Sequence, residues 1–71
     1  MLLPLAFADA PCGADLARVL LGGPFTLLAD LDLPGDLRVL WPGQRVTDEV
    51  QKLRLNAQVS DHGVLQRVFC G

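Results

Sequence analysis

The clearest pattern in the chain is an alternation of apolar and polar residues in its last third. Apolar residues take every second position there, and polar residues stand between them: Leu53, Arg54, Leu55, Asn56, Ala57, Gln58 and Val59. This two-residue period predicts a strand with one buried face. A turn cluster at residues 60–63 predicts a hairpin, with residues 64–70 as the returning strand. That strand alternates poorly, so we expect it to be covered on both faces or bulged.

Shorter patterns fill the rest of the chain. A brief alternation over residues 37–41 predicts a third strand, which a Pro-Gly pair ends. Residues 15–21 carry apolar side chains at the spacing of one helical face: Leu16, Val19 and Leu20. A second short helical turn is expected at residues 25–31, with Leu28 and Leu31 facing inward. Helical segments followed by strands predict an α+β domain.

Length and charge limit the kinds of protein this can be. Seventy-one residues, 51% of them hydrophobic, suffice for one small folded domain whose core alone is marginal. A net charge of −2 provides no basic surface for nucleic acid or an anionic membrane. No apolar stretch approaches the ~20 residues of a membrane span. We therefore expect no nucleic-acid partner and no membrane span.

Two cysteines stand near the ends of the predicted domain. Cys12 and Cys70 are too far apart for a Cys-x-x-Cys motif, and the single His62 cannot complete a zinc site with them. We expect no metal and no cofactor. A bond between them would stabilise so small a domain by about 4 kcal/mol and would indicate an oxidising compartment. The alternative is two buried free thiols in a cytosolic protein.

The first eight residues also bear on export. They are apolar and end in Ala6-Phe7-Ala8, the small-x-small pattern of a signal-peptidase site. They lack a basic start, and the apolar run is short, so we interpret residues 1–8 as a signal-peptide remnant and residues 9–71 as a single domain. An ordinary apolar N-terminus packed on the domain is the alternative. Together with the cysteines, this favours an exported protein, periplasmic or secreted.

Candidate catalytic groups are few. The glycines form neither a Gly-x-Gly-x-x-Gly motif nor a P-loop. Asp48 and Glu49 are adjacent, so on an extended chain their carboxylates point to opposite sides. His62 lies in the hairpin turn, where we expect it to be solvated. Without a catalytic constellation the chain is not expected to be an enzyme.

The remaining feature is a polar loop at residues 43–52, which has no helical spacing. Arg54 and Asn56 lie on one face of the strand that follows it. If that face looks toward the loop, Arg54 can pair with the Glu49 carboxylate and with loop carbonyls. Asn56 can then bond to the loop backbone or to the Thr47 hydroxyl. On spacing alone, an ordinary strand with a solvated polar face is equally well supported.

Short motifs in the second half of the chain occur together in a fixed order: Arg38-Val39-Leu40, Pro42-Gly43, Val46-Thr47, Arg54-Leu55-Asn56, Gly63, Leu65, Arg67-Val68 and Cys70-Gly71. This series resembles small secreted inhibitors typified by a fungal elastase inhibitor, peptidase inhibitor family seventy-eight. A looser likeness around Cys12 and Pro24 extends it over most of residues 11–71. The resemblance implies a potato-inhibitor-I-like fold, with an N-terminal helix packed on a small mixed three-stranded sheet and an extended exposed binding loop.

The resemblance also implies a function and a site. Such a protein inhibits serine endopeptidases as a monomer, presenting residues 43–51 as a substrate with Asp48–Glu49 as the reactive bond. The inhibitory loop would comprise Gln44, Arg45, Val46, Thr47, Asp48, Glu49 and Val50. Thr47 and Glu49 would hydrogen-bond to the scaffold, Arg54 and Asn56 would support the loop, and Cys12 and Cys70 would form the one disulfide.

One residue departs from the family pattern. The family usually has Met or another apolar residue where this chain has Asp48. A carboxylate suits neither an elastase-like nor a chymotrypsin-like pocket, and the acidic pocket of trypsin would repel it. We therefore expect a subtilisin-like or acidic-specific serine protease as the partner. The alternative function is a non-inhibitory exported protein-binding module of the same fold.

Overall fold

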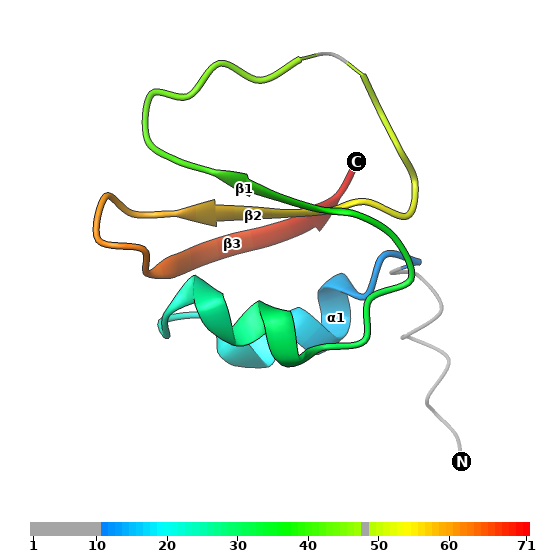
Figure 1. Ribbon diagram of the computed structural model, residues 1–71, viewed down its shortest axis with the longest axis horizontal. Helices are drawn as coiled ribbons and strands as arrows, with labels where there is room; N and C mark the ends of the chain where they lie inside the picture. The colour runs from blue at the N-terminus through cyan, green and yellow to red at the C-terminus, as the bar shows by residue number, and fades with distance from the viewer. Residues whose placement is uncertain (1–10, 48) are drawn as a thin grey trace.

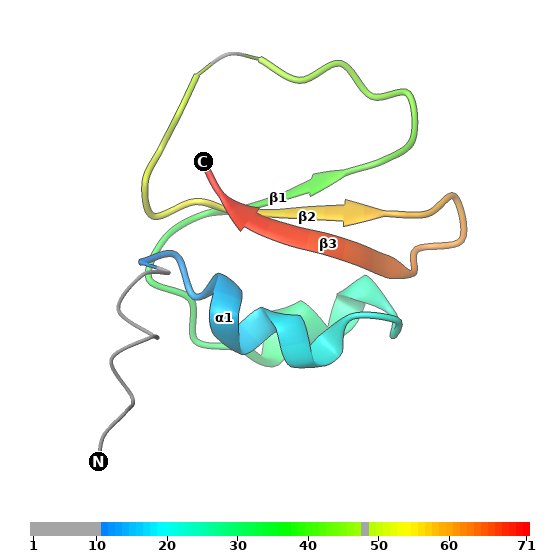
Figure 2. The ribbon, with the colours of Figure 1, turned by 180° about the vertical axis from the view of Figure 1, so that it is seen from behind.

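A helical layer covers one face of a three-stranded sheet, and a long loop extends from the side opposite the helices (Figure 1). This is a computed structural model, which describes residues 11–47 and 49–71. The helical layer and the sheet follow one another in the chain: α1 Ala14–Ala17, the 3₁₀ segments η2 Arg18–Leu20 and η3 Phe25–Asp30, then β1 Leu37–Leu40, β2 Leu55–Val59 and β3 Leu65–Cys70. Figure 2 shows the same arrangement from behind. The predicted α+β architecture of helix and mixed three-stranded sheet is thus confirmed.

The first helix is shorter than predicted, and it buries a different face. Ala14 and Ala17 are buried, whereas Leu16 and Val19 are 60% and 82% exposed, so the predicted apolar face was wrong at those two positions. The physical reason is that Ala14 and Ala17, three residues apart, form the buried side of the helix, and Leu16 and Val19 point to its opposite side. The small alanines let the helix lie close against the sheet.

The sheet has the order β1-β2-β3, with β1 parallel to β2 and β2 antiparallel to β3. Parallel neighbours need a connection that returns along the whole strand, and this is usually a helix. Here residues 41–54 make that connection without a helix or strand in their described part. The topology therefore forces this segment to be long and extended.

Two details of the predicted strands are resolved. β2 begins at Leu55. The preceding Leu53 is exposed and lies in a turn, in which the Arg54 N–H donates to the Gln51 carbonyl at 3.0 Å. The predicted place of Leu53 on the buried face was therefore wrong. The register of β2 and β3 shifts between Gln58 and Val59, and this bulge explains the poor alternation of the last strand.

The core lies between the helical layer and one face of the sheet. Leu28 is buried as predicted, and Leu31 packs partly buried against the core. A disulfide bond joins Cys12 to Cys70, with their Cα atoms 5.6 Å apart, so the start of the helical layer is tied to the end of β3. Among the described residues, none of the helices is both long and apolar enough to span a membrane. The predicted signal-peptide remnant, residues 1–8, lies outside the described part.

Candidate functional site

The connection between β1 and β2 is the exposed loop that the sequence predicted. Every described residue from 41 to 53 is exposed. We divide it at Asp48, which lies outside the described residues, into an N-terminal limb, residues 41–47, and a C-terminal limb, residues 49–54. The two limbs contact the rest of the protein through different groups.

Arg54 holds the C-terminal limb. Its Nη2 donates to the Glu49 carbonyl oxygen at 2.7 Å, and its Nε donates to the main-chain oxygen of Gly71 at 2.9 Å. The residue is only 8% exposed, so both bonds are largely shielded from water. Hydrogen bonds from a charged donor are shorter and stronger than those between neutral groups. The sequence-based expectation that Arg54 reaches loop carbonyls agrees with this geometry.

The Glu49 side chain behaves differently from the expectation. Its carboxylate oxygen Oε2 accepts a hydrogen bond from Gln51 Nε2 at 3.2 Å, on the exposed surface. Within residues 11–47 and 49–71 the carboxylate makes no ion pair with Arg54, because the guanidinium is already directed at two main-chain oxygens. Arg54 therefore fixes the backbone at Glu49 rather than its side chain.

Asn56 is fully buried on the sheet face that looks away from the helices. The strand register places Arg38 of β1 and Phe69 of β3 beside it. Arg38 Nε donates to Asn56 Oδ1 at 2.6 Å, and Asn56 Nδ2 donates to the Phe69 carbonyl at 3.4 Å. One side chain thus links all three strands. In the described part of the chain no hydrogen bond joins Asn56 to Thr47, so its expected contact with the loop is absent here.

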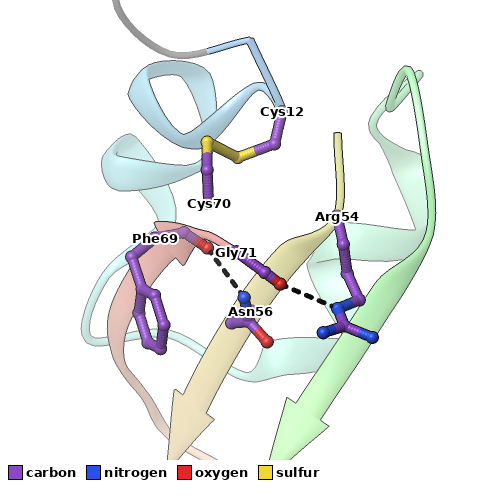
Figure 3. The surroundings of a disulfide bond; sticks show 6 residues. All are labelled: Cys12, Arg54, Asn56, Phe69, Cys70 and Gly71. Atoms are coloured by element: carbon purple, nitrogen blue, oxygen red, sulfur yellow. Dashed lines mark hydrogen bonds between the residues drawn. A yellow bond between two sulfur atoms is a disulfide. The ribbon is translucent and has the colours of Figure 1, made fainter. Parts of the chain in front are cut away.

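The structure adds two residues to the site that sequence reasoning missed. Gly71 bonds to Arg54 twice, because the Gly71 N–H also donates to the Arg54 carbonyl at 3.1 Å. Figure 3 shows Arg54 directed at Gly71 and Asn56 directed at Phe69, beside the disulfide. Arg38 is the second addition. No period along the chain could have revealed either contact, since both depend on which strands are neighbours.

The N-terminal limb is anchored at its root. The Trp41 and Phe25 rings meet edge to face, with centroids 5.4 Å apart and planes at 82°. The Gln44 N–H donates to the Trp41 carbonyl at 3.0 Å, and Gln44 Oε1 accepts from the Trp41 N–H at 3.1 Å. A cavity of about 340 Å³ is lined by this limb and by Gln58, Val59 and Gln66 of the hairpin.

The described His, Cys, Asp and Glu residues do not gather in one cluster. Within the residues that the structure describes, no group of three or more His, Cys, Asp and Glu could hold a metal ion. Both cysteines form the disulfide. His62 is exposed in the hairpin turn, as expected, and its Nδ1 lies 2.9 Å from Asp61 Oδ1. The described part of the site is a loop held by hydrogen bonds from Arg54.

Comparisons with known proteins agree with this description. The sequence model of the Peptidase inhibitor I78 family matches residues 12–71. Among solved structures, that of the elastase inhibitor AFUEI matches with a TM-score of 0.75 and 30% sequence identity, over 87% of this chain and 97% of that one. Among curated proteins, none matches the chain significantly. The likeness to potato inhibitor I stays a prediction.

Proposed function

The chain belongs to the peptidase inhibitor I78 family, and from this membership we propose that it inhibits a serine endopeptidase by presenting residues 43–51 as a substrate-like loop. The proposed reactive bond is Asp48–Glu49. As a member of an inhibitor family, the protein is a protease inhibitor and not an enzyme. The serine class of the target, the reactive bond and the supporting roles of Arg54 and Asn56 are the proposal.

The observation that supports it most directly is the 2.7 Å bond from Arg54 to the Glu49 carbonyl. Glu49 follows the proposed reactive bond, so this contact holds the half of the loop that carries the new amine after cleavage. A held amine attacks the acyl group again much faster than a free one, because no translational or rotational freedom must be lost first. Religation then competes with hydrolysis, and the protease remains occupied.

The exposed residues before the bond suit a protease groove. Gln44, Arg45, Val46 and Thr47 form an exposed stretch without helix or strand, and Val50 is exposed beyond the bond. An extended segment of this kind can pair with a protease as an added strand, with alternate side chains entering pockets. Ordering the loop before binding reduces the entropy lost in the complex.

Asp48 decides which protease fits. The similar solved structure is that of an elastase inhibitor, but an ionised Asp48 in a small apolar pocket would lose hydration without gaining a partner. A subtilisin-like or acidic-specific protease is therefore the proposed target, bound by a monomeric inhibitor.

The Cys12–Cys70 bond fits an oxidising compartment, so we propose that residues 9–71 act outside the cytoplasm, as a single domain.

The direct test is inhibition of a panel containing subtilisin, a glutamyl endopeptidase, elastase, chymotrypsin and trypsin. We expect inhibition of subtilisin or the glutamyl endopeptidase at micromolar inhibitor or below. The matched variant Asp48→Met should instead inhibit elastase or chymotrypsin, since an apolar residue then fills an apolar pocket. If neither form inhibits any member of the panel, the inhibitory function is wrong, and a non-inhibitory exported binding module becomes the better explanation.

A further inference from the structure

The end of the chain lies against the residue that holds the loop. β3 ends at Cys70, and Gly71 then makes two hydrogen bonds with Arg54, one in each direction. The acceptor for Arg54 Nε is the Gly71 main-chain oxygen, at 2.9 Å. Nε and Nη2 belong to one planar guanidinium, so a bond at Nε also sets the direction of Nη2. That second nitrogen points at the Glu49 carbonyl, at 2.7 Å.

The tail, defined as residues 69–71, is itself held from two sides. On one side, the disulfide ties Cys70 to Cys12, which is fully buried at the start of the helical layer. On the other side, Asn56 donates to the Phe69 carbonyl, and Arg38 in turn donates to Asn56 (Figure 3). The side chain of Asn56 is fully buried, so water does not compete for these bonds. The tail is therefore fixed in position where it bonds to Arg54.

We propose that this tail is a positioning element of the inhibitory loop: the Cys12–Cys70 disulfide, with Asn56 and Arg38, holds Gly71 where it aims Arg54 at Glu49. The disulfide then serves two purposes, the stability of the domain and the rigidity of a loop on the other side of the sheet. Arg38 and Asn56 act on the loop through the tail. This inference rests on the proposed function, because it explains how the C-terminal limb stays in place.

A purely structural disulfide would behave differently. Removing it would lower the stability of the whole domain, but the orientation of Arg54 in the molecules that remain folded would not change. A positioning tail predicts a local effect on Arg54 at unchanged global stability. A variant that disturbs Gly71 and leaves the disulfide intact distinguishes the structural role from the positioning role.

Gly71→Pro is that variant. Proline lacks the N–H that donates to the Arg54 carbonyl, and it cannot adopt the Gly71 φ of 152°. The first readout needs no protease: the rate at which the Arg54 Nε–H exchanges with water, measured by ¹⁵N NMR. We expect exchange about tenfold faster or more, the size of one lost charged hydrogen bond. The control Leu28→Val lies in the helical layer and should lower the melting temperature with no change in that exchange rate.

The second readout is hydrolysis of the Asp48–Glu49 bond by the panel protease that the parent inhibits, followed by mass spectrometry. Gly71→Pro should raise the rate about tenfold, and the double variant Cys12→Ala, Cys70→Ala should raise it at least as much at a temperature where it is folded. In an Arg54→Ala background, Gly71→Pro should add nothing, because the tail acts through Arg54.

Unchanged Arg54 exchange in Gly71→Pro would overturn the positioning role, as would effects of Gly71→Pro and Arg54→Ala that simply add. Faster Arg54 exchange combined with no inhibition by the parent would support the positioning of Arg54 and overturn the inhibitory function alone.

Discussion

The N-terminal limb of the loop meets the rest of the protein through an aromatic contact, whereas the C-terminal limb meets it through a guanidinium. Trp41 packs on Phe25 at the root of the first limb. Arg54 reaches five residues back along the second limb to the Glu49 carbonyl, next to the proposed reactive bond. Among the described residues, no hydrogen bond joins residues 45–47 to the sheet.

Among the described residues, the two limbs of the loop are therefore held to different extents. The aromatic contact fixes the start of the N-terminal limb, whereas Gln44 and Val46 further along that limb line a cavity of about 340 Å³. A short, charge-assisted bond fixes one carbonyl in position and direction. On the proposed mechanism, the stronger hold lies on the side that carries the new amine, where religation requires it.

The largest expected effect comes from Arg54→Ala. It removes both bonds and leaves the Gly71 main-chain oxygen without its partner, so hydrolysis of the loop by the target protease should rise roughly 100-fold, the size of one or two charged hydrogen bonds. Mass spectrometry of the inhibitor during incubation with the protease measures this rate. Arg18→Ala, an exposed arginine of the helical layer, is the matched control and should hydrolyse like the parent. An Arg54→Ala protein that resists cleavage as well as the parent would rule out the bracing role.

A smaller effect is expected from Gly35→Ala. A methyl group at this position would overlap the Leu53 carbonyl oxygen and lie 2.8 Å from the Leu53 Cβ, so the backbone just before Arg54 must move. We expect a loss of stability of about 1–3 kcal/mol, and loop hydrolysis faster than the parent but slower than in Arg54→Ala. Thermal unfolding and the cleavage assay check the two parts. Gly23→Ala, where the new methyl makes only ordinary contacts, is the control; equal hydrolysis by both alanine variants would show that Gly35 does not act on the C-terminal limb.

The smallest effect on the loop is expected from Trp41→Ala. The variant loses the edge-to-face contact with Phe25 and part of its buried area, a cost to stability of about 1–2 kcal/mol. Hydrolysis of the loop should change less than about threefold, because the bond to Glu49 is untouched. Denaturant unfolding and the cleavage assay measure the two quantities. If Trp41→Ala increases hydrolysis as much as Arg54→Ala does, the inequality between the limbs is wrong.

Sequence patterns located the elements better than they located the faces. Strong alternation predicted β2, and glycine and proline marked most element ends. The prediction of the buried face of the first helix was wrong at Leu16 and Val19, because the two small residues Ala14 and Ala17 pack against the core and turn the larger side chains outward. The predicted position of Leu53 was also wrong. Leu53 continues the alternation of β2 in sequence, but a turn at residues 51–54 takes it out of the strand.

What the sequence determined by itself was local and periodic: the strands, the exposed loop between them, the two cysteines available for a bond, and the common face of Arg54 and Asn56. Only the tertiary structure decided what those side chains touch. Arg54 bonds to Gly71 at a separation of 17 residues, and Asn56 accepts from Arg38 at a separation of 18. Such contacts depend on strand order, on the parallel pairing of β1 with β2, and on the disulfide that fixes the tail. Period along a chain carries no information about which strand becomes a neighbour, because pairing is decided by the burial of the whole sheet face against the helical layer.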